Sequence, residues 1–253
     1  TPSNLKFLST SGLWHCLAHV VRGRAELAFQ SFKLHPTLNA ALKTQGYEAP
    51  TPIQQESIPV IMKGHDVLGL AQTGTGKTAA FVLPTLHRLL EGKHRGIGLL
   101  IVTPTRELAE QILSVVQDFS KKSKIRSMSI YGGMSMNTQI SKLREGVDVV
   151  VACPGRLCDH LRRRTIDLSR VGTLVLDEAD MLLDMGFFPS VREILKHLPE
   201  KRQSLLFSAT MPAPIKKLSD KFLSNPKQVE VARAGLTNEM IDQRLVEGSS
   251  ARG

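Results

Sequence analysis

The chain has 253 residues, of which 42% are apolar, so it is long enough for one large domain or two small ones around a substantial core. Lysine and arginine number 33 against 23 aspartates and glutamates. This excess of +10 favours an anionic partner such as nucleic acid, although a solvated basic surface would give the same total.

The cysteine count and the apolar runs narrow the class of protein further. The 3 cysteines form no C-x-x-C pair, which argues against a disulfide framework and a zinc site. No apolar run reaches the roughly 18 residues that a membrane helix needs. We therefore expect a soluble protein of a reducing compartment, the cytoplasm, with the nucleus left open.

The two ends of the chain differ from its middle. Residues 1–28 carry three lysines and arginines before the first acid, Glu26, so we expect an N-terminal extension that is flexible, vector-derived or a transit peptide. The last segment, VEGSSARG, is rich in glycine and serine, and residues 241–253 are expected to begin a linker. Between these ends we expect one domain over residues 29–240.

Within this domain, short continuous apolar runs alternate with amphipathic segments of helical length. Continuous runs are typical of strands that are covered on both faces. The alternation predicts a parallel sheet wrapped by helices, a three-layer doubly wound α/β fold. The expected strands are 66–70, 98–102, 126–131, 148–152, 173–176, 204–207 and 228–232, and the clearest helical segments are 76–90, 105–119 and 190–198.

Polar signatures follow six of these strands. In chain order they are AQTGTGKT, TPTREL, GG, CPGR, DEAD and SAT. Ligands of open α/β sheets bind at the carboxyl ends of the strands, so we expect the six segments to converge on one edge.

The segment after the first strand predicts a phosphate-binding loop. Gly74 and Gly76 permit a tight turn with inward-pointing N–H groups, and the next helix adds its positive N-terminal end. Lys77 is placed to reach the β- and γ-phosphates, and Thr78 to place its hydroxyl on Mg²⁺. Ala71 departs from the strict pattern, which has glycine there. The alternative is a glycine loop that only connects strand and helix.

The acidic residues after the fifth strand complement this loop. Asp177 is placed to hold the metal ion through its waters, and Glu178 to orient or deprotonate the attacking water. Lys77, Asp177 and Glu178 are therefore the expected catalytic residues, and Thr78 and Asp177 the expected metal-binding residues. The alternative is an acidic cluster that caps a helix.

Two hydroxyls after the sixth strand also have two possible roles. Ser208 and Thr210 are placed to hydrogen-bond Asp180 and to transmit the state of the nucleotide. Alternatively, they cap a helix that begins in the following segment, MPAPIKKL.

The remaining signatures indicate residues that bind a phosphate backbone. Arg106 and Arg156 each follow a strand and a proline, and Thr105 adds a hydroxyl. Gly132 and Gly133 would allow a backbone to approach closely. Each residue alone also suits a turn or a helix start. The few aromatic residues argue against a base-stacking platform and hence against sequence readout.

Together these residues resemble the DEAD-box family of ATP-dependent RNA helicases, which belongs to superfamily 2. Asp177-Glu178-Ala179-Asp180 is its namesake motif, and AQTGTGKT, PTRELAEQ, GG, PGR and SAT stand in the family's order. GYEAPTPIQ (46–54) matches the Q-motif, with Phe29 seventeen residues before Gly46. The resemblance runs from Phe29 to Val246, is greatest to bacterial general-purpose members, and implies the N-terminal RecA-like P-loop NTPase domain.

The resemblance also implies roles for residues. Gln54 would read the adenine edge, with Phe29 and Tyr47 near the base. Asp180, Ser208 and Thr210 would couple hydrolysis to the separation of short RNA duplexes. The implied site for ATP and Mg²⁺ is Phe29, Tyr47, Gln54, Thr73, Gly74, Thr75, Gly76, Lys77, Thr78, Asp177 and Glu178, and the implied RNA contacts are Pro104, Thr105, Arg106, Gly133, Pro154, Gly155 and Arg156.

Two substitutions and one absence depart from the family's pattern. Cys153 stands in place of threonine, which puts some RNA affinity in doubt, and Met181 stands where arginine is common. The family has a second RecA-like domain that contributes RNA contacts and an arginine finger worth roughly 10³–10⁵ in turnover. We find no second set of motifs. We therefore expect a monomer that binds ATP or ADP with Mg²⁺, hydrolyses slowly and does not unwind RNA alone.

Two other functions remain open at this point. One is a non-catalytic RNA-binding or scaffold module that retains a nucleotide pocket, against which the intact Lys77, Asp177 and Glu178 argue. The other is a different strand–helix ATPase, such as a DNA helicase or a transporter motor, against which Gln54 and its flanking residues argue.

Overall fold

The computed structural model describes residues 28–92 and 95–231. The expected extension, apart from its last residue, lies outside the described residues. So do residues 232–240 of the expected domain and the expected linker over 241–253.

All seven predicted strands are present and form one sheet in the order β3-β4-β2-β5-β6-β1-β7. Every pairing between neighbouring strands is parallel, as predicted. The strands are β1 (Val67–Leu70), β2 (Leu99–Val102), β3 (Ser127–Ile130), β4 (Val149–Ala152), β5 (Thr173–Leu176), β6 (Gln203–Ser208) and β7 (Lys227–Glu230).

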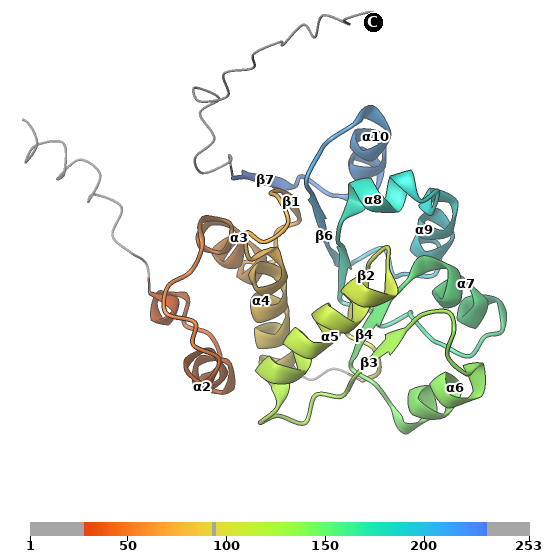
Figure 1. Ribbon diagram of the computed structural model, residues 1–253, viewed down its shortest axis with the longest axis horizontal. Coiled ribbons are helices and arrows are strands. Elements are labelled where there is room, and N and C mark those ends of the chain that lie inside the picture. Colours follow the sequence, from red (N-terminus) through yellow and green to blue (C-terminus); the bar gives the residue numbers. More distant parts are fainter. Residues whose placement is uncertain (1–27, 93–94, 232–253) are drawn as a thin grey trace, which may run out of the picture.

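Helices cover both faces of the sheet (Figure 1), which confirms the predicted three-layer fold. One face carries η1 (Phe29–Phe32), α2 (Pro36–Thr44), α3 (Pro52–Met62), α4 (Lys77–Glu91) and α5 (Arg106–Ser120). The other carries α6 (Met136–Glu145), α7 (Pro154–Arg162), α8 (Ala179–Asp184), α9 (Phe188–Leu195) and α10 (Ala213–Phe222). None of these helices, over the described ranges, is long and apolar enough to cross a membrane.

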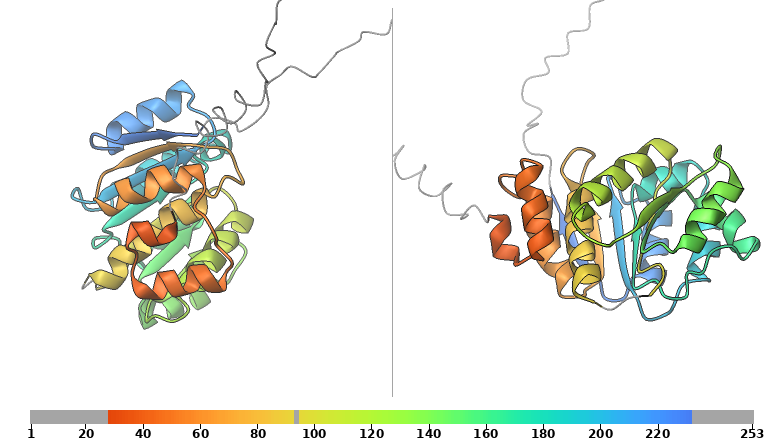
Figure 2. Two further views of the ribbon diagram at one scale, coloured as in Figure 1. Left: turned by 90° about the vertical axis from the view of Figure 1, so that its left-hand side faces the viewer. Right: turned by 90° about the horizontal axis from the view of Figure 1, so that it is seen from below.

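The strands β2, β4, β5 and β6 are fully buried between the two helical layers, which Figure 2 shows from two further sides. In β2, Leu99 and Ile101 belong to the core shared with α3, α4 and α5. Leu100 and Val102 belong to the core shared with helices α7 to α10. Both faces of the strand therefore need apolar residues, which explains the continuous apolar runs in the sequence.

The winding of the chain reverses after α5. The crossovers through α4 and α5 lie on one face, whereas those from α6 onward lie on the other. Because all strands are parallel, every connection begins at the same carboxyl edge. A doubly wound sheet of this kind binds its ligands at that edge.

At the opposite edge, buried polar side chains hold the fold together. The Asp66 carboxylate accepts the main-chain N–H groups of Ser204 at 2.8 Å and Ser224 at 2.7 Å. Gln203 Nε2 donates to the main-chain carbonyls of Ile61 in α3, at 3.0 Å, and of His65 in the following loop, at 2.6 Å. These contacts tie the starts of β1 and β6 to their neighbours, so they are structural.

Candidate functional site

The carboxyl edge of the sheet divides into two adjoining halves. The neighbouring strands β5, β6 and β1 end in the acidic segment, the SAT segment and the glycine loop. The neighbouring strands β3, β4 and β2 end in the GG, CPGR and TPTREL segments. The predicted convergence on one edge is therefore present, and the strand order sorts the six segments into two groups of three.

The glycine loop has the backbone that its sequence predicts. Gly74 and Gly76 have φ angles of +84° and +91°, in the left-handed region that favours glycine. Gly76 is the N-cap of α4, and Lys77 is the first residue of that helix. The N–H groups of this first turn point toward the loop, which suits an anion.

Lys77 connects the loop to the acidic segment. Its Nζ lies 2.9 Å from Glu178 Oε1, and both side chains are buried. Glu178 Oε1 also accepts a hydrogen bond from the Thr73 hydroxyl at 3.3 Å. Folding thus brings together two segments about 100 residues apart in the sequence, as predicted.

Asp177 is a carboxylate in an unusually dry environment. It is 2% exposed, and burial raises its pKa to about 7, although the nearby Lys77 opposes this shift and Glu178 adds to it. Its Oδ1 has no hydrogen-bond partner among the residues that the structure describes. A buried carboxylate oxygen left in this state is suited to a cation.

The donor set around Asp177 suits Mg²⁺ in particular. Within the described ranges, no three His, Cys, Asp or Glu side chains cluster to form an all-protein metal site. Mg²⁺ is commonly held by one or two carboxylates together with substrate phosphates and waters. Asp177, with Thr78 beside Lys77 in the first turn of α4, could supply the protein's share of such a site.

Glu178 has an uncommon backbone conformation. Its φ and ψ are 51° and 54°, in the left-handed region, which is unfavourable for a residue with a side chain. Such strain tends to occur where a side chain must be held in one direction for function. Here it aims the carboxylate at Lys77 and Thr73.

Gln54 contacts the main chain of the glycine loop. Its Oε1 accepts the Thr51 N–H at 3.0 Å, and its Nε2 donates to the Gly76 carbonyl at 3.1 Å. A Cβ atom on Gly76 would lie 2.5 Å from Gln54 Nε2, so only glycine fits there. The structure thus shows Gln54 supporting the loop, and its predicted role in reading adenine stays a prediction.

Phe29 and Tyr47 pack against each other. Their ring centroids are 6.0 Å apart in an edge-to-face arrangement, and Tyr47 also contacts Phe119 at 5.4 Å. Phe29 is buried and Tyr47 is half-buried. Their predicted position near a base is not tested by these contacts.

Asp180 links the acidic segment to the SAT segment. Its Oδ2 accepts the N–H groups of Ala209 at 3.1 Å and Thr210 at 2.9 Å, and the Thr210 hydroxyl at 3.1 Å. Its own N–H donates to Ser208 Oγ at 3.2 Å. The predicted contact is therefore present. The alternative role as a helix cap is wrong, because the N-cap of α10 is Pro212.

In the other half of the edge, Thr105 and Arg106 begin α5. Pro104 is buried, and the Thr105 hydroxyl caps the helix by accepting the Leu108 N–H at 3.2 Å. The Arg106 guanidinium is exposed and lies against Gly133, where a Cβ atom would collide with it. Gly133 also has a φ of +91°, in the left-handed region that favours glycine.

Arg156 is fixed by residues that the sequence did not single out. Its Nη1 donates to the Met134 carbonyl at 2.8 Å and to Gln139 Oε1 at 3.2 Å. The same Gln139 oxygen lies 2.9 Å from His160 Nε2, and burial lowers the His160 pKa. His160 is fully buried, which fits a structural role. Nothing in the sequence pattern marked Gln139.

Cys153, one of the two departures from the family's pattern, and the matching Gly155 lie at the start of α7. Cys153 is the N-cap of α7 but provides no side-chain cap. Burial raises its pKa to about 11, so the thiol stays protonated. Pro154 is the first residue of α7, and Gly155 is exposed, with no atom within 4 Å of the position that a methyl group would take. The fold itself therefore does not require glycine at position 155.

Three basic residues of the predicted site share an unexpected position. Lys77, Arg106 and Arg156 each lie in the first turn of a helix, at the positive end of the helix dipole. A cation at this end typically costs about 0.3–1 kcal/mol. These side chains therefore do not stabilise their helices. A bound anion would relieve the repulsion at all three positions.

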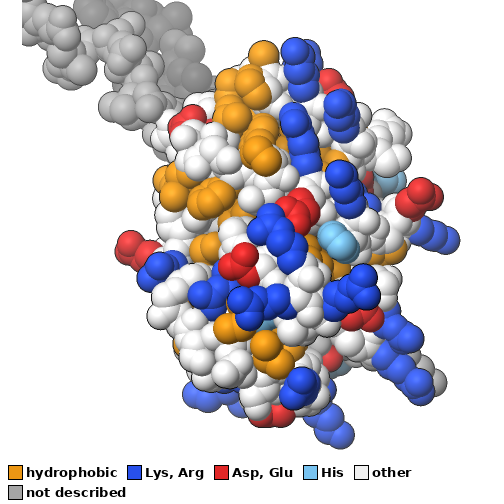
Figure 3. All heavy atoms as spheres, turned by 90° about the vertical axis from the view of Figure 1, so that its right-hand side faces the viewer, with side chains coloured by type: hydrophobic (Ala, Val, Ile, Leu, Met, Phe, Trp, Pro, Cys, Tyr) orange, Lys and Arg blue, Asp and Glu red, His pale blue; other side chains and the backbone are white. Residues whose placement is uncertain are grey.

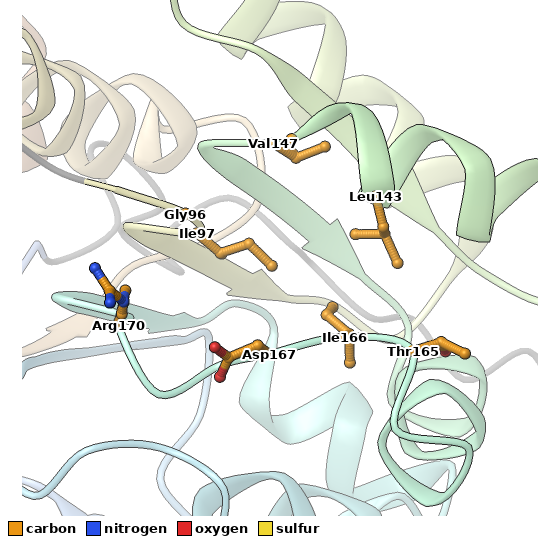
Figure 4. A pocket seen from close by; sticks show the side chains of 9 residues that line it. Gly96, Ile97, Leu143, Val147, Thr165, Ile166, Asp167 and Arg170 are labelled. Carbon is orange, nitrogen blue, oxygen red and sulfur yellow. The ribbon is translucent and has the colours of Figure 1, made fainter.

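Other surfaces of the molecule offer less specific chemistry. Figure 3 shows lysine and arginine side chains spread over the face that lies to the right in Figure 1, mixed with acidic ones. A cavity of about 150 Å³ lies between the starts of β2 and β4 and the 165–170 loop, at the edge opposite the site. Its lining in Figure 4 is mainly aliphatic, with Asp167 and Arg170 at one side.

Comparison with known proteins agrees with this geometry. A family model described as DEAD/DEAH box helicase matches residues 51–218. The chain is 45% identical to the ATP-dependent RNA helicase DeaD of Buchnera aphidicola, over 86% of this chain and 36% of that protein. It is 42% identical to the ATP-dependent RNA helicase CshA of Listeria monocytogenes, over 87% of this chain and 42% of that protein. It therefore spans less than half of the length of these two relatives.

Solved structures show the same likeness. A DEAD box protein from the hyperthermophile Methanococcus jannaschii superposes with a TM-score of 0.76 at 36% identity, over 80% of this chain and 55% of that one. A hypothetical ATP-dependent RNA helicase from Sulfolobus tokodaii gives a TM-score of 0.72 at 36% identity, over 78% and 57% of the two chains.

Proposed function

This chain belongs to the DEAD/DEAH box helicase family, and from that premise we propose that it is the ATP-binding half of an ATP-dependent RNA helicase. It binds ATP with Mg²⁺ on the β5-β6-β1 half of the carboxyl edge and the RNA backbone on the β3-β4-β2 half. The observation that carries the proposal is the buried Lys77–Glu178 contact of 2.9 Å beside the unpartnered Asp177 Oδ1.

Binding of nucleotide would rearrange the charges around Lys77. A phosphate on the glycine loop would compete with Glu178 for the Lys77 ammonium, because both groups are anions. Glu178 is then free to accept a proton from the attacking water, and Thr73 keeps its carboxylate oriented. Asp177 and Thr78 would hold Mg²⁺, which supplies the positive charge that offsets charge development on the phosphates.

RNA would bind through its phosphates. Arg106 and Arg156 lie at helix starts where main-chain N–H groups also face outward, so the site is prepared for anions rather than for bases. Gly155 leaves room for a backbone to approach. The contacts include no aromatic stacking surface, which supports binding without sequence preference.

Asp180 would couple ATP hydrolysis to the separation of RNA strands. It holds the SAT segment by three hydrogen bonds to one oxygen, and it follows Glu178 by two residues in the same acidic segment. A shift of the acidic segment on nucleotide binding would therefore move Ser208 and Thr210. We propose that a second RecA-like domain, joined to this chain in the full-length protein, completes catalysis and strand separation. The chain itself acts as a cytoplasmic monomer.

Titration of ADP with Mg²⁺ into this chain tests the nucleotide site. Lys77→Met should weaken binding at least tenfold, since it removes a charged contact to phosphate. Lys63→Met, at an exposed lysine outside the site, is the control and should bind like the wild type. Equal affinities in all three proteins would contradict the proposal.

The two alternative functions predict different outcomes in a two-domain version. A scaffold that merely retains a nucleotide pocket would show the same turnover with and without Glu178→Gln. A DNA helicase or transporter motor would prefer DNA duplexes or ignore nucleic acid. The proposed helicase loses RNA-stimulated turnover on Glu178→Gln and prefers RNA.

A further inference from the structure

Thr103 is a polar side chain that the proposed mechanism leaves unused. It directly follows β2 and is fully buried. Its main-chain N–H donates to the Ala152 carbonyl at 3.0 Å, so the backbone here continues the sheet. Its Oγ1, however, has no hydrogen-bond partner among the residues that the structure describes. Buried hydroxyls are nearly always hydrogen-bonded, so this atom indicates a contact beyond the protein's own groups.

Thr103 and Asp177 are neighbours across the sheet. Val102 pairs with Leu176, and the Asp177 N–H donates to the Val102 carbonyl at 2.9 Å, so the next pair along is Thr103 and Asp177. Side chains alternate between the faces of a sheet. Val102 and Leu176 both face the layer of α7 to α10, so Thr103 and Asp177 both face the layer that contains Lys77.

The two unpartnered oxygens therefore belong to neighbouring positions on the same side of the sheet. Thr103 Oγ1 and Asp177 Oδ1 are both buried, and they do not hydrogen-bond each other. Two polar atoms that face the same space without direct contact are suited to one bridging water. Mg²⁺ retains several of its waters in protein sites, and Asp177 is the carboxylate that faces the ion in the proposed function.

We propose that Thr103 is a positioning residue for the metal site: its hydroxyl and Asp177 Oδ1 together bind a water of the Mg²⁺ hydration shell. The inference rests on the proposed function, because the ion enters with the nucleotide. The hydroxyl fixes the water, and the water fixes the direction of the Asp177 carboxylate. Thr103 thus links the β2 end of the phosphate-backbone half to the metal ion of the nucleotide half.

The test compares ADP affinity in Mg²⁺ with ADP affinity in EDTA, both by calorimetry on the intact chain. The ratio of the two affinities measures the contribution of the ion. Thr103→Val removes the hydroxyl at nearly constant volume, and we expect it to lower the ratio about three- to tenfold. Thr103→Ser retains the hydroxyl and should therefore show the same ratio as the wild type.

A matched control separates this effect from a general loss of packing. Thr85 is also buried, but its hydroxyl donates to the Phe81 carbonyl within α4 at 2.7 Å. Thr85→Val should therefore leave the ratio unchanged. A ratio in Thr103→Val equal to that of the wild type would overturn the proposal.

The wild-type titration separates a failure of the proposed nucleotide site from a failure of the role of Thr103 alone. If Mg²⁺ gives wild-type protein no gain in ADP affinity, the proposed nucleotide site fails, and this inference falls with it. If the gain is present and Thr103→Val retains it, only the role of Thr103 fails. Should Thr103→Val not fold, a crystal structure of the wild type with ADP and Mg²⁺ decides: a water within about 3.2 Å of both oxygens is expected, and its absence refutes the role.

Discussion

Asp177→Asn should make the protein more stable at neutral and alkaline pH while removing its metal ligand. The pKa of Asp177 rises from 3.8 to about 7 in the fold, chiefly because the carboxylate is buried. A raised carboxyl pKa means that the protonated form is favoured in the folded state. This contribution to stability is fully present below pH 3.8, is lost as the pH rises toward 7, and is absent above it.

The magnitude follows from the size of the shift. About three pKa units at 1.36 kcal/mol each correspond to a cost of up to about 4 kcal/mol for the ionised carboxylate at pH 8. Asparagine resembles the protonated acid and avoids this cost. The gain of the variant over the wild type should shrink to about 2 kcal/mol at pH 5, where most of the wild-type Asp177 is protonated.

Urea unfolding followed by circular dichroism at pH 5 and pH 8 measures both values. Asp220→Asn, at an exposed acid on α10, is the control and should show no such pH-dependent gain. The reasoning is refuted if Asp177→Asn is less stable than the wild type at pH 8, or if its gain is the same at both pH values. The variant should also lose the Mg²⁺-dependent part of ADP binding, which would show that the buried charge is kept for function at the expense of stability.

Gly76→Ala should destabilise the fold by about 1–3 kcal/mol and abolish ADP binding, because the residue has a left-handed backbone and the new methyl group would meet Gln54; urea unfolding and calorimetry check both effects. Gly155→Ala, where the methyl group meets no atom, should unfold like the wild type but weaken the binding of single-stranded RNA by fluorescence anisotropy. Cys153→Thr should stabilise the protein by about 1 kcal/mol in urea unfolding, because a threonine hydroxyl can cap α7 where the thiol does not. Asp180→Asn should cost about 1.5–3 kcal/mol in the same assay, because the charge strengthens three hydrogen bonds to one oxygen; an unchanged midpoint would show that these contacts are weak.

The arrangement of the motifs was predictable because it depends on topology alone. Parallel strands covered on both faces leave continuous apolar runs, and the chain must turn at their carboxyl ends. The sequence therefore sufficed to bring Lys77 to Glu178 and Asp180 to Thr210. Strand order was not predicted, because nothing in the sequence says which buried strands pair. That order separates the nucleotide half from the phosphate-backbone half.

Individual side-chain contacts were harder to foresee because they depend on rotamers and packing. The bond from Gln54 to the Gly76 carbonyl requires α3 to begin beside the glycine loop. The segment Thr51-Pro52-Ile53-Gln54 does carry a helix-start signal, a threonine followed three residues later by glutamine, that could have predicted α3. Gln139, which bridges Arg156 and His160, carries no such signal.

The backbone conformation of Glu178 is a further feature that the sequence did not predict. Sequence patterns assign a following helix and a favourable acidic start, whereas the structure has a left-handed residue at the N-cap of α8. The backbone preference of residues with a side chain is thus violated at Glu178, the predicted general base. Such departures are expected at functional sites, where the surrounding fold holds an unfavourable local state.

The most direct test of the account is the position of the metal ion. Crystals of this chain grown with a non-hydrolysable ATP analogue and Mn²⁺ in place of Mg²⁺ would reveal the ion by its anomalous scattering. The account predicts a single strong peak facing Asp177 Oδ1, about 2.1 Å away if the carboxylate binds directly or about 4 Å away through one water. An analogue seated on the glycine loop with its ion elsewhere, or no analogue bound at that loop, would contradict it.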